Sequence, residues 1–173
     1  LSFFTKLDSD RIHPRYMSLV RTGRTSSYGP NIQQLPRDGR VREAIIAPPG
    51  CSFYVVDYGF IELRTLAAVC ESLYGWSQLA NVIREGTDPH CFVAAMFEGV
   101  SLETFLAWKQ SDPQRYANLR QRAKALNFGI PGGLGAKTLV QYARQTYMVE
   151  LTLDDAQAFR PTLITQVFPE LTW

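Results

Sequence analysis

The chain has 173 residues, 46% of them hydrophobic and 20% charged, and its formal net charge is +2. This length and apolar share are ordinary for a soluble globular domain that can bury a core. Because this net charge is so close to neutral, it gives no support for nucleic-acid binding. The evidence for such a site must come from the positions of the arginines in the sequence.

The cysteines and the lack of long apolar runs restrict the cellular compartments in which we expect this protein. Cys51, Cys70 and Cys91 are odd in number and form no C-x-x-C pair, so neither a disulfide framework nor a zinc ribbon is indicated, and a reducing interior is favoured. No apolar stretch approaches the roughly 18 residues of a membrane span, and the N-terminus lacks the regions of a signal peptide. We therefore expect a cytoplasmic protein without a membrane partner. Because the chain opens with Leu1 rather than Met, we also expect it to be part of a longer protein.

The first 60 residues combine turn formers with short β-prone runs. Residues 1–40 are interrupted by Gly and Pro turns, which indicates loops and short strands. The content of β-branched and aromatic residues rises over 41–47 and again over 52–57, around a turn at 48–50. The pattern predicts two strands joined by this turn, the second of which ends at Asp57.

From Ile61 onward the apolar spacing is helical. Asp88 and Asp112 each precede a proline as capping carboxylates, and Thr152 begins a capping-box pattern. Residues 129–133 are rich in Gly and Pro and cannot continue a helix. We therefore expect an α+β fold that is mostly α-helical. The predicted helices span residues 61–71, 77–85, 89–98, 101–109, 113–129, 135–147 and 153–163.

Asp57 is a candidate metal ligand because a carboxylate at the end of a buried strand has a fixed backbone and a side chain at the surface. Mg²⁺ prefers carboxylate and carbonyl oxygens, so Asp57 with the backbone carbonyl of Tyr58 would make half a site. On this feature alone, a helix cap or a surface charge is the more common explanation. A two-metal site needs a second carboxylate, and the sequence has no other acid at the end of a predicted strand.

Arg120, Lys124 and Phe128 recur every four residues and therefore share one face of the predicted helix. Two cations about one turn apart match the spread of a triphosphate, and the aromatic ring could stack on a base or sugar. A solvated basic face with an inward Phe is the common alternative. Against it, other positions can bury the helix and leave the cations free to face a ligand; these are Ala123, Ala125, Leu126 and Ile130.

Two weaker candidates come from polar groups near turns and helix starts. His90 lies one residue into a helix and could donate to a phosphate near the positive helix end, although such a histidine is more often incidental. Arg24, Asn31 and Gln33 lie in a polar, turn-rich segment whose groups could contact base edges in a DNA minor groove. By composition alone, a polar turn without function is the better explanation of that segment.

In order and spacing, three blocks of this chain resemble the conserved segments of the family A DNA polymerases, over roughly residues 11–147. The first resembles the primer-template segment of that family, the second its motif A and the third its motif B. The blocks read Thr22-Gly23-Arg24-x-Ser26-Ser27-x-x-Pro30-Asn31-x-Gln33-x-x-Pro36, Asp57-Tyr58-x-x-Ile61-Glu62-Leu63-Arg64, and Arg120-x-x-x-Lys124-x-x-x-Phe128-Gly129.

The resemblance implies a right-hand polymerase fold, with a partial palm in residues 1–72 and helical fingers in residues 73–173. It implies a DNA-directed DNA polymerase that transfers a nucleotide from a dNTP to a primer 3′-hydroxyl with two Mg²⁺ ions in the complete enzyme. Its partners would be primer-template DNA and dNTPs, in a bacterial cell or a phage-infected host. The alternatives are a non-catalytic, DNA-binding relic of such an enzyme, and a single-subunit RNA polymerase, which Glu62 disfavours.

The same resemblance implies roles for the motif A residues and for the primer-template segment. Asp57 would be a catalytic metal ligand, assisted by the carbonyl of Tyr58. Glu62 would be the steric gate that crowds the sugar 2′ position and excludes ribonucleotides. The residues implied to follow the minor groove of primer and template are Arg24, Asn31 and Gln33.

For the fingers, the resemblance implies a dNTP site. Arg120 and Lys124 would bind the triphosphate, with Lys124 also the general acid for pyrophosphate departure. Phe128 would support the incoming sugar and base, and Phe in place of Tyr implies discrimination against dideoxynucleotides. His90 lies in an Asp-x-His context similar to the phosphate-contacting histidine of the family.

The chain departs from the family pattern at three places. Gly59-Phe60 stands where the family has Ser-Gln, which removes polar contacts near the nucleotide. Gly132 replaces an expected aromatic residue, in a Pro-Gly-Gly version of motif B that is similar to bacteriophage members. This replacement leaves open how the template base is stacked and how Glu62 is braced. Motif C, which bears the second metal aspartate, is not found, so we expect this chain to be inactive alone.

Overall fold

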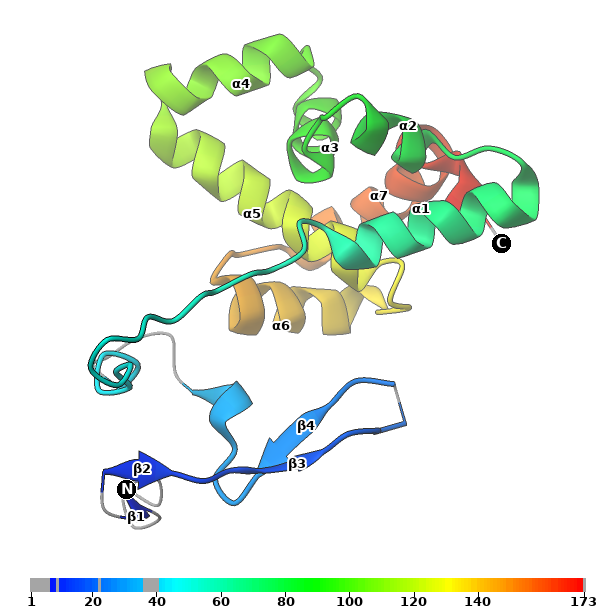
Figure 1. Ribbon diagram of the computed structural model, residues 1–173. Helices are drawn as coiled ribbons and strands as arrows, with labels where there is room; N and C mark the ends of the chain where they lie inside the picture. Colours follow the sequence, from blue (N-terminus) through cyan, green and yellow to red (C-terminus); the bar gives the residue numbers. More distant parts are fainter. Residues whose placement is uncertain (1–6, 9, 22, 36–40, 173) are drawn as a thin grey trace. The chain divides into compact units, whose positions relative to one another are not determined.

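A computed structural model describes residues 7–8, 10–21, 23–35 and 41–172. By the contacts between residues, the chain divides into two compact units, residues 1–56 and residues 57–173. Each unit is described by itself below (Figure 1). The predicted division into a palm part, residues 1–72, and a fingers part, residues 73–173, concerns function and stays a prediction.

The first unit contains two short antiparallel strand pairs. Strand β1 (Leu7–Asp8) pairs with β2 (Arg11–Ile12), and β3 (Arg15–Met17) pairs with β4 (Ser26–Tyr28). A short 3₁₀ helix, η2 (Ile32–Gln34), follows. These elements agree with the loops and short strands predicted for residues 1–40.

The two strands predicted at 41–47 and 52–57 are wrong. Residues 41–44 form a turn, and residues 51–58 have no regular structure. Tyr54, Val55 and Val56 are 93%, 93% and 88% exposed. A strand forms when a neighbouring strand pairs its N–H and C=O groups, so β propensity alone is not sufficient. Among the residues that the structure describes, no strand pairs with this segment.

The second unit is helical, and all seven predicted helices are confirmed to within three residues at their ends. Together with the strand pairs of the first unit, they confirm the expected α+β, mostly helical fold. The helices are α1 (Ile61–Tyr74), α2 (Gln78–Arg84), α3 (Pro89–Glu98), α4 (Leu102–Ser111), α5 (Pro113–Gly129), α6 (Ala136–Tyr147) and α7 (Leu153–Thr162), followed by a π-type turn, η3 (Leu163–Val167), and a 3₁₀ turn, η4 (Pro169–Leu171).

Local capping explains where these helices begin and end. Asp88 accepts from the backbone N–H of His90 at 2.8 Å, and Asp112 accepts from that of Arg115 at 3.2 Å. Thr152 begins α7 with the expected capping box. Each cap satisfies N–H groups that have no partner inside the first helical turn.

Helix α5 is central to the packing of the second unit, where it contacts α3, α4 and α6 (Figure 1). Helix α6 packs against α7, and α1 packs against α2. The C-terminal turn is tied to this bundle through Glu170, whose Oε1 accepts from the Ser77 hydroxyl and the Leu79 N–H, both at 2.8 Å. The largest fully buried side chains include Phe105, Leu126, Leu139, Leu163 and Phe168.

In the described part of the chain, no single helix is long and apolar enough to cross a membrane. The pair α3 and α4 meets the length and composition test only when both helices are taken together across a 99° bend.

Candidate functional site

Helix α5 carries the predicted stripe of Arg120, Lys124 and Phe128. As expected, Ala123, Ala125, Leu126 and Ile130 are buried, which anchors the helix and fixes which side faces outward. The three stripe residues are each half-buried at the border of this core. Their side chains therefore start from a rigid backbone, which suits a binding site.

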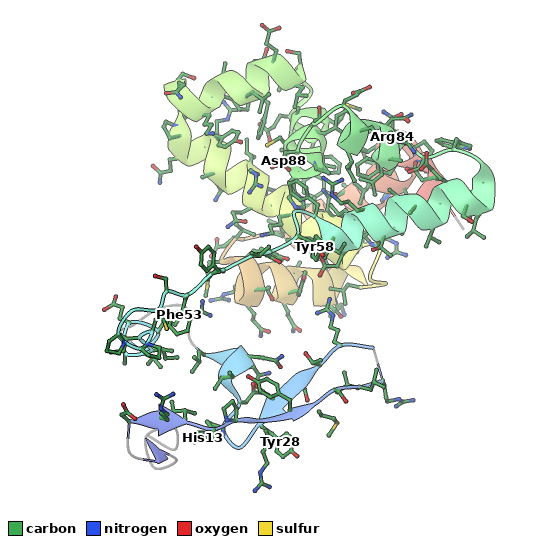
Figure 2. The ribbon with its side chains drawn as sticks, viewed as in Figure 1. His13, Tyr28, Phe53, Tyr58, Arg84 and Asp88 are labelled. Carbon is green, nitrogen blue, oxygen red and sulfur yellow. The ribbon has the colours of Figure 1, made fainter. Side chains whose placement is uncertain are left out.

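Arg120 is not free, contrary to the expectation. Its Nε and Nη2 donate to Oδ2 of Asp88 at 2.8 and 2.6 Å. The other oxygen of Asp88 caps α3, which Figure 2 shows with Asp88 labelled at its start. One carboxylate thus joins the start of α3 to the middle of α5. The sequence predicted the cap, but it gave no sign of the second contact, because the partner is 32 residues away.

Burial and charge act in opposite directions on this ion pair. Burial by itself raises the pKa of Asp88, but the Arg120 hydrogen bonds and the N–H of His90 outweigh it and hold the pKa below its usual value. Burial likewise lowers the pKa of Arg120, and Asp88 more than restores it. Both groups are therefore charged near neutral pH.

His90 is buried, with only 1% of its surface exposed. Its Nδ1 lies 3.0 Å from Nδ2 of Asn127, which also lies 3.2 Å from the Pro89 carbonyl oxygen. Because an amide N–H₂ only donates, Nδ1 of His90 accepts and the ring proton sits on Nε2. Burial, reinforced by the charges of Arg120 and Lys124, lowers the pKa of His90 to about 4 despite the opposing charge of Asp88. A neutral His90 would thus offer one N–H donor at neutral pH.

Two phenylalanine rings from separate segments contact the His90 ring. The Phe60 ring lies 5.4 Å from the His90 ring in an edge-to-face arrangement, and the Phe128 ring lies 5.5 Å from it on the other helix. Phe60 precedes α1, His90 is in α3 and Phe128 is in α5. The structure therefore brings together His90, Arg120 and Phe128, as the dNTP-site prediction requires, and adds Phe60.

Acidification is expected to destabilise the fold through His90. Its pKa is about 4 in the folded chain and about 6.5 in an unfolded one, so between these values only the unfolded state binds the proton. Stability should therefore fall as the pH drops from about 6.5 to 4, by about 2–3 kcal/mol at pH 4.5. Asp88, whose pKa is lowered, loses its contribution only below its usual titration range.

The measurement is urea unfolding of the chain at pH 7 and pH 4.5. His90→Gln should remove most of the pH dependence, whereas His13→Gln, at an exposed position labelled in Figure 2, should leave it unchanged. An equal pH dependence in wild type and His90→Gln would contradict the assignment.

Lys124 differs from Arg120 in having no anionic partner. Its Nζ lies 5.6 Å from the centroid of the Tyr147 ring. In the described ranges, no carboxylate lies within 4.0 Å of this ammonium group. Lys124 therefore carries the uncompensated positive charge of the stripe.

The motif A residues lie at the start of the second unit. Asp57 and Glu62 are exposed, and Tyr58, labelled in Figure 2 just before α1, is 77% exposed. A carboxylate and a backbone carbonyl are hard oxygen donors of the kind that Mg²⁺ takes, so Asp57 and Tyr58 fit half of a site. No group of three or more His, Cys, Asp or Glu side chains is arranged to hold a metal ion among the described residues.

The predicted DNA-contacting residues belong to the first unit. Asn31 Oδ1 caps η2 by accepting from the Gln33 N–H at 3.1 Å, and it accepts from the Ser27 hydroxyl at 2.9 Å. Gln33 Oε1 accepts from the Ser27 N–H at 2.9 Å. Both amides therefore fix the turn after β4 to that strand. Arg24 lies in the loop between β3 and β4, where its carbonyl accepts from the Val20 N–H.

Gly132, which replaces an expected aromatic residue, lies in the tight turn after α5. Its N–H bonds to the Phe128 carbonyl, and a Cβ at this position would lie 2.8 Å from that oxygen. The turn therefore excludes any side chain at 132 unless the backbone shifts. The physical reason is that residues 130–133 form the tight turn that follows the last helical residue, Gly129.

Gly132→Ala is expected to destabilise the chain by about 1–3 kcal/mol because the new methyl group forces the turn apart. Gly59→Ala is the matched control, since nothing lies within 4 Å of a Cβ there and its φ lies outside the left-handed region. Thermal and urea unfolding of the two variants measure the difference. Equal stability of the two variants would show that the turn is not constrained in this way.

Sequence reasoning missed three residues of the cluster. The sequence predicts Asp88 only as a helix cap and marks Phe60 only as a departure from the family pattern, and it assigns no role to Asn127. A buried amide between the apolar Leu126 and Phe128 is the one signal that could have marked Asn127, because a buried polar side chain needs a partner.

Comparisons with known proteins agree with the motifs. The sequence pattern that describes DNA polymerase family A matches residues 1–166. DNA polymerase I of Aquifex aeolicus is 33% identical over 155 residues, which are 89% of this chain and 24% of that protein. Thermostable DNA polymerase I of Thermus aquaticus is 36% identical over 154 residues, 86% of this chain and 16% of that protein.

DNA polymerase I of Rhizobium leguminosarum is 37% identical over 134 residues, which are 75% of this chain and 12% of that protein. The similarity therefore covers most of this chain, while the chain spans between 12% and 24% of the length of these three relatives.

Proposed function

Because this chain belongs to DNA polymerase family A, we propose that it forms the start of the palm and most of the fingers of a DNA-directed DNA polymerase. The complete enzyme joins the α-phosphate of a dNTP to a primer 3′-hydroxyl and releases pyrophosphate. Since the chain is a small share of its relatives' length, we expect this activity from the full-length protein and not from these 173 residues alone.

The observation that supports this proposal most directly is the cluster on α3 and α5. Two cations one turn apart, a neutral imidazole N–H donor and an aromatic ring suit the triphosphate and the sugar or base of one nucleotide. Asp88 compensates the charge of Arg120. A triphosphate would therefore have to draw Arg120 away from Asp88, whereas Lys124 needs no such exchange.

The metal site requires more than this chain supplies. Asp57 and the carbonyl of Tyr58 would hold Mg²⁺, with a second carboxylate from motif C needed for the two-metal arrangement. Mg²⁺ bound there would activate the primer hydroxyl and neutralise charge on the phosphates. Asp57 contributes a negative charge, and its exposed position leaves it open to such ligands.

The remaining predicted residues would choose the sugar and hold the DNA. Glu62, in the first turn of α1, would crowd a ribose 2′-hydroxyl. Asn31 and Gln33 would follow the minor groove together with Arg24, on the rigid turn that their amide oxygens build. The Pro-Gly-Gly turn is consistent with a bacteriophage-like member, acting in the cytoplasm of a bacterial cell or a phage-infected host.

Primer extension by the full-length protein tests this function. We expect a labelled primer on a DNA template to be extended with dNTPs and Mg²⁺, with each ribonucleotide used far less efficiently than its deoxynucleotide. Binding of primer-template DNA without any extension would favour the non-catalytic relic instead. Equal use of ribonucleotides and deoxynucleotides would contradict the assigned role of Glu62.

A further inference from the structure

Phe60 has a backbone conformation that its side chain disfavours. It is the residue before α1, with φ 56° and ψ 35°, in the left-handed region that glycine tolerates and a bulky residue does not. Its side chain makes no capping hydrogen bond to the helix. A residue in this strained conformation persists where surrounding contacts hold it, and such strain is concentrated at functional sites.

The contacts that hold Phe60 are aromatic. Its ring packs edge to face with the His90 ring, with 5.4 Å between the two ring centroids. The centroid of the His90 ring in turn lies 5.5 Å from that of the Phe128 ring. Edge-to-face pairs at this separation are favourable beyond the burial of their area. The chain of rings thus runs from the start of α1, through α3, to the nucleotide stripe on α5.

This ring chain also controls the first turn of α1. Glu62 lies two residues after Phe60, and Ile61 between them is 43% exposed, so it contributes little anchoring. A second tether is the hydrogen bond from Arg64 Nε to the Gly59 carbonyl at 2.9 Å. Leu63, which is 3% exposed, also anchors this turn in the core. Phe60 is the side chain that links the turn to His90 and, through His90, to Phe128.

We propose that Phe60 is a positioning residue for sugar selection: its ring docks the first turn of α1 on His90 and Phe128 and so fixes where the Glu62 carboxylate lies. This inference rests on the proposed function, in which Glu62 excludes ribonucleotides. Phe60 does not touch the reacting atoms. It acts through Glu62, and it also covers His90 from solvent.

Two substitutions separate the ring from the backbone conformation. Phe60→Gly removes the ring and relieves the positive φ, so the variant keeps the favoured turn and should fold. Phe60→Tyr keeps the ring. Phe97→Leu is the matched control, because it removes one ring of another aromatic pair, with Phe159 at 4.6 Å, that does not touch this chain of rings.

The first measurement is the ratio of deoxynucleotide to ribonucleotide incorporation efficiency by the full-length protein. We expect Phe60→Gly to lower this ratio about 10-fold, which corresponds to about 1.4 kcal/mol, mainly by improving ribonucleotide use. Phe60→Tyr should keep the wild-type ratio, because it keeps the ring, and Phe97→Leu should also leave the ratio unchanged. Glu62→Ala should lower it further than Phe60→Gly does.

The second measurement does not depend on catalysis. The pKa of His90, followed by NMR of its ring protons in this chain, should rise from about 4 toward 6.5 in Phe60→Gly and stay low in Phe60→Tyr. The groups that also act on His90 are Asp88, Arg120 and Lys124, and they are unchanged in both variants.

The outcomes separate the two proposals. If Glu62→Ala lowers the ratio and Phe60→Gly does not, the positioning role of Phe60 is overturned while the proposed function stands. If Glu62→Ala leaves the ratio unchanged, sugar selection at this gate is refuted, and the role of Phe60 with it. An unchanged His90 pKa in Phe60→Gly would refute the docking contact itself.

Discussion

Replacing Asp57 with asparagine in the full-length protein is expected to reduce primer extension about 1000-fold or more. Asparagine keeps the size of the side chain but removes the negative charge that a divalent metal ion requires. Because metal-assisted stabilisation of the transferred phosphoryl group is worth several kcal/mol, losing one carboxylate ligand costs about three orders of magnitude in rate. Single-turnover extension of a labelled primer at saturating dNTP measures it.

The fold should not respond to this substitution. Asp57 is exposed and, in the part of the chain that the structure describes, makes no hydrogen bond or ion pair, so the Tm and the affinity for primer-template DNA should stay close to wild type. Asp154→Asn, which removes an exposed acid from the first turn of α7, is the control for loss of charge. Synthesis by Asp57→Asn at the level of this control would refute the metal role.

Lys124→Met should lower kcat/KM for dNTPs by between about 10² and 10⁴. The lower limit is the loss of a charge-assisted hydrogen bond to phosphate, and the upper one adds the loss of a general acid for pyrophosphate. Lys124 has no carboxylate partner among the described side chains, so methionine should leave the free energy of unfolding nearly unchanged. Pre-steady-state incorporation of one nucleotide, with urea unfolding alongside, separates the two effects.

Two further variants distinguish an electrostatic role of Lys124 from a role as general acid. Lys124→Arg keeps the positive charge but cannot give up a proton at ordinary pH, so it should bind dNTP well and lose kcat if Lys124 is the general acid. Lys109→Met, at an exposed position of α4, should change neither parameter. Full kcat in Lys124→Arg would leave only the electrostatic role.

Arg120 should behave differently from Lys124, since its removal affects both the fold and the binding of dNTP. Arg120→Met leaves Asp88, which is mostly buried, without its cation, and an unpaired, partly buried charge is destabilising. A loss of activity in that variant is therefore not a clean measure of phosphate binding. Lys124, which has no carboxylate partner in the described structure, gives the cleaner test of the same helix face.

Local patterns in the sequence were sufficient to predict the helices and the motifs. The positions of Asp88, Asp112 and Thr152 fixed where three helices begin, because capping depends on residues within one turn of each other. The spacing of Arg120, Lys124 and Phe128 fixed that they share a face of α5, for the same local reason. The family, too, could be identified from three blocks of sequence.

Which of these groups are paired, buried or unsupported depends on how the helices pack against one another. The contact of Asp88 with Arg120 joins residues 32 positions apart, and the contact of Glu170 with Ser77 joins residues 93 apart. Spacing along the chain carries no information about such pairs, since they depend on how helices pack. The strand predicted at 52–57 is wrong for the same reason, because a strand exists through the partner that pairs with it. Phe60 illustrates both kinds of information. The sequence shows that it departs from the family pattern two residues before Glu62, whereas the packing of α1, α3 and α5 shows that its ring contacts His90.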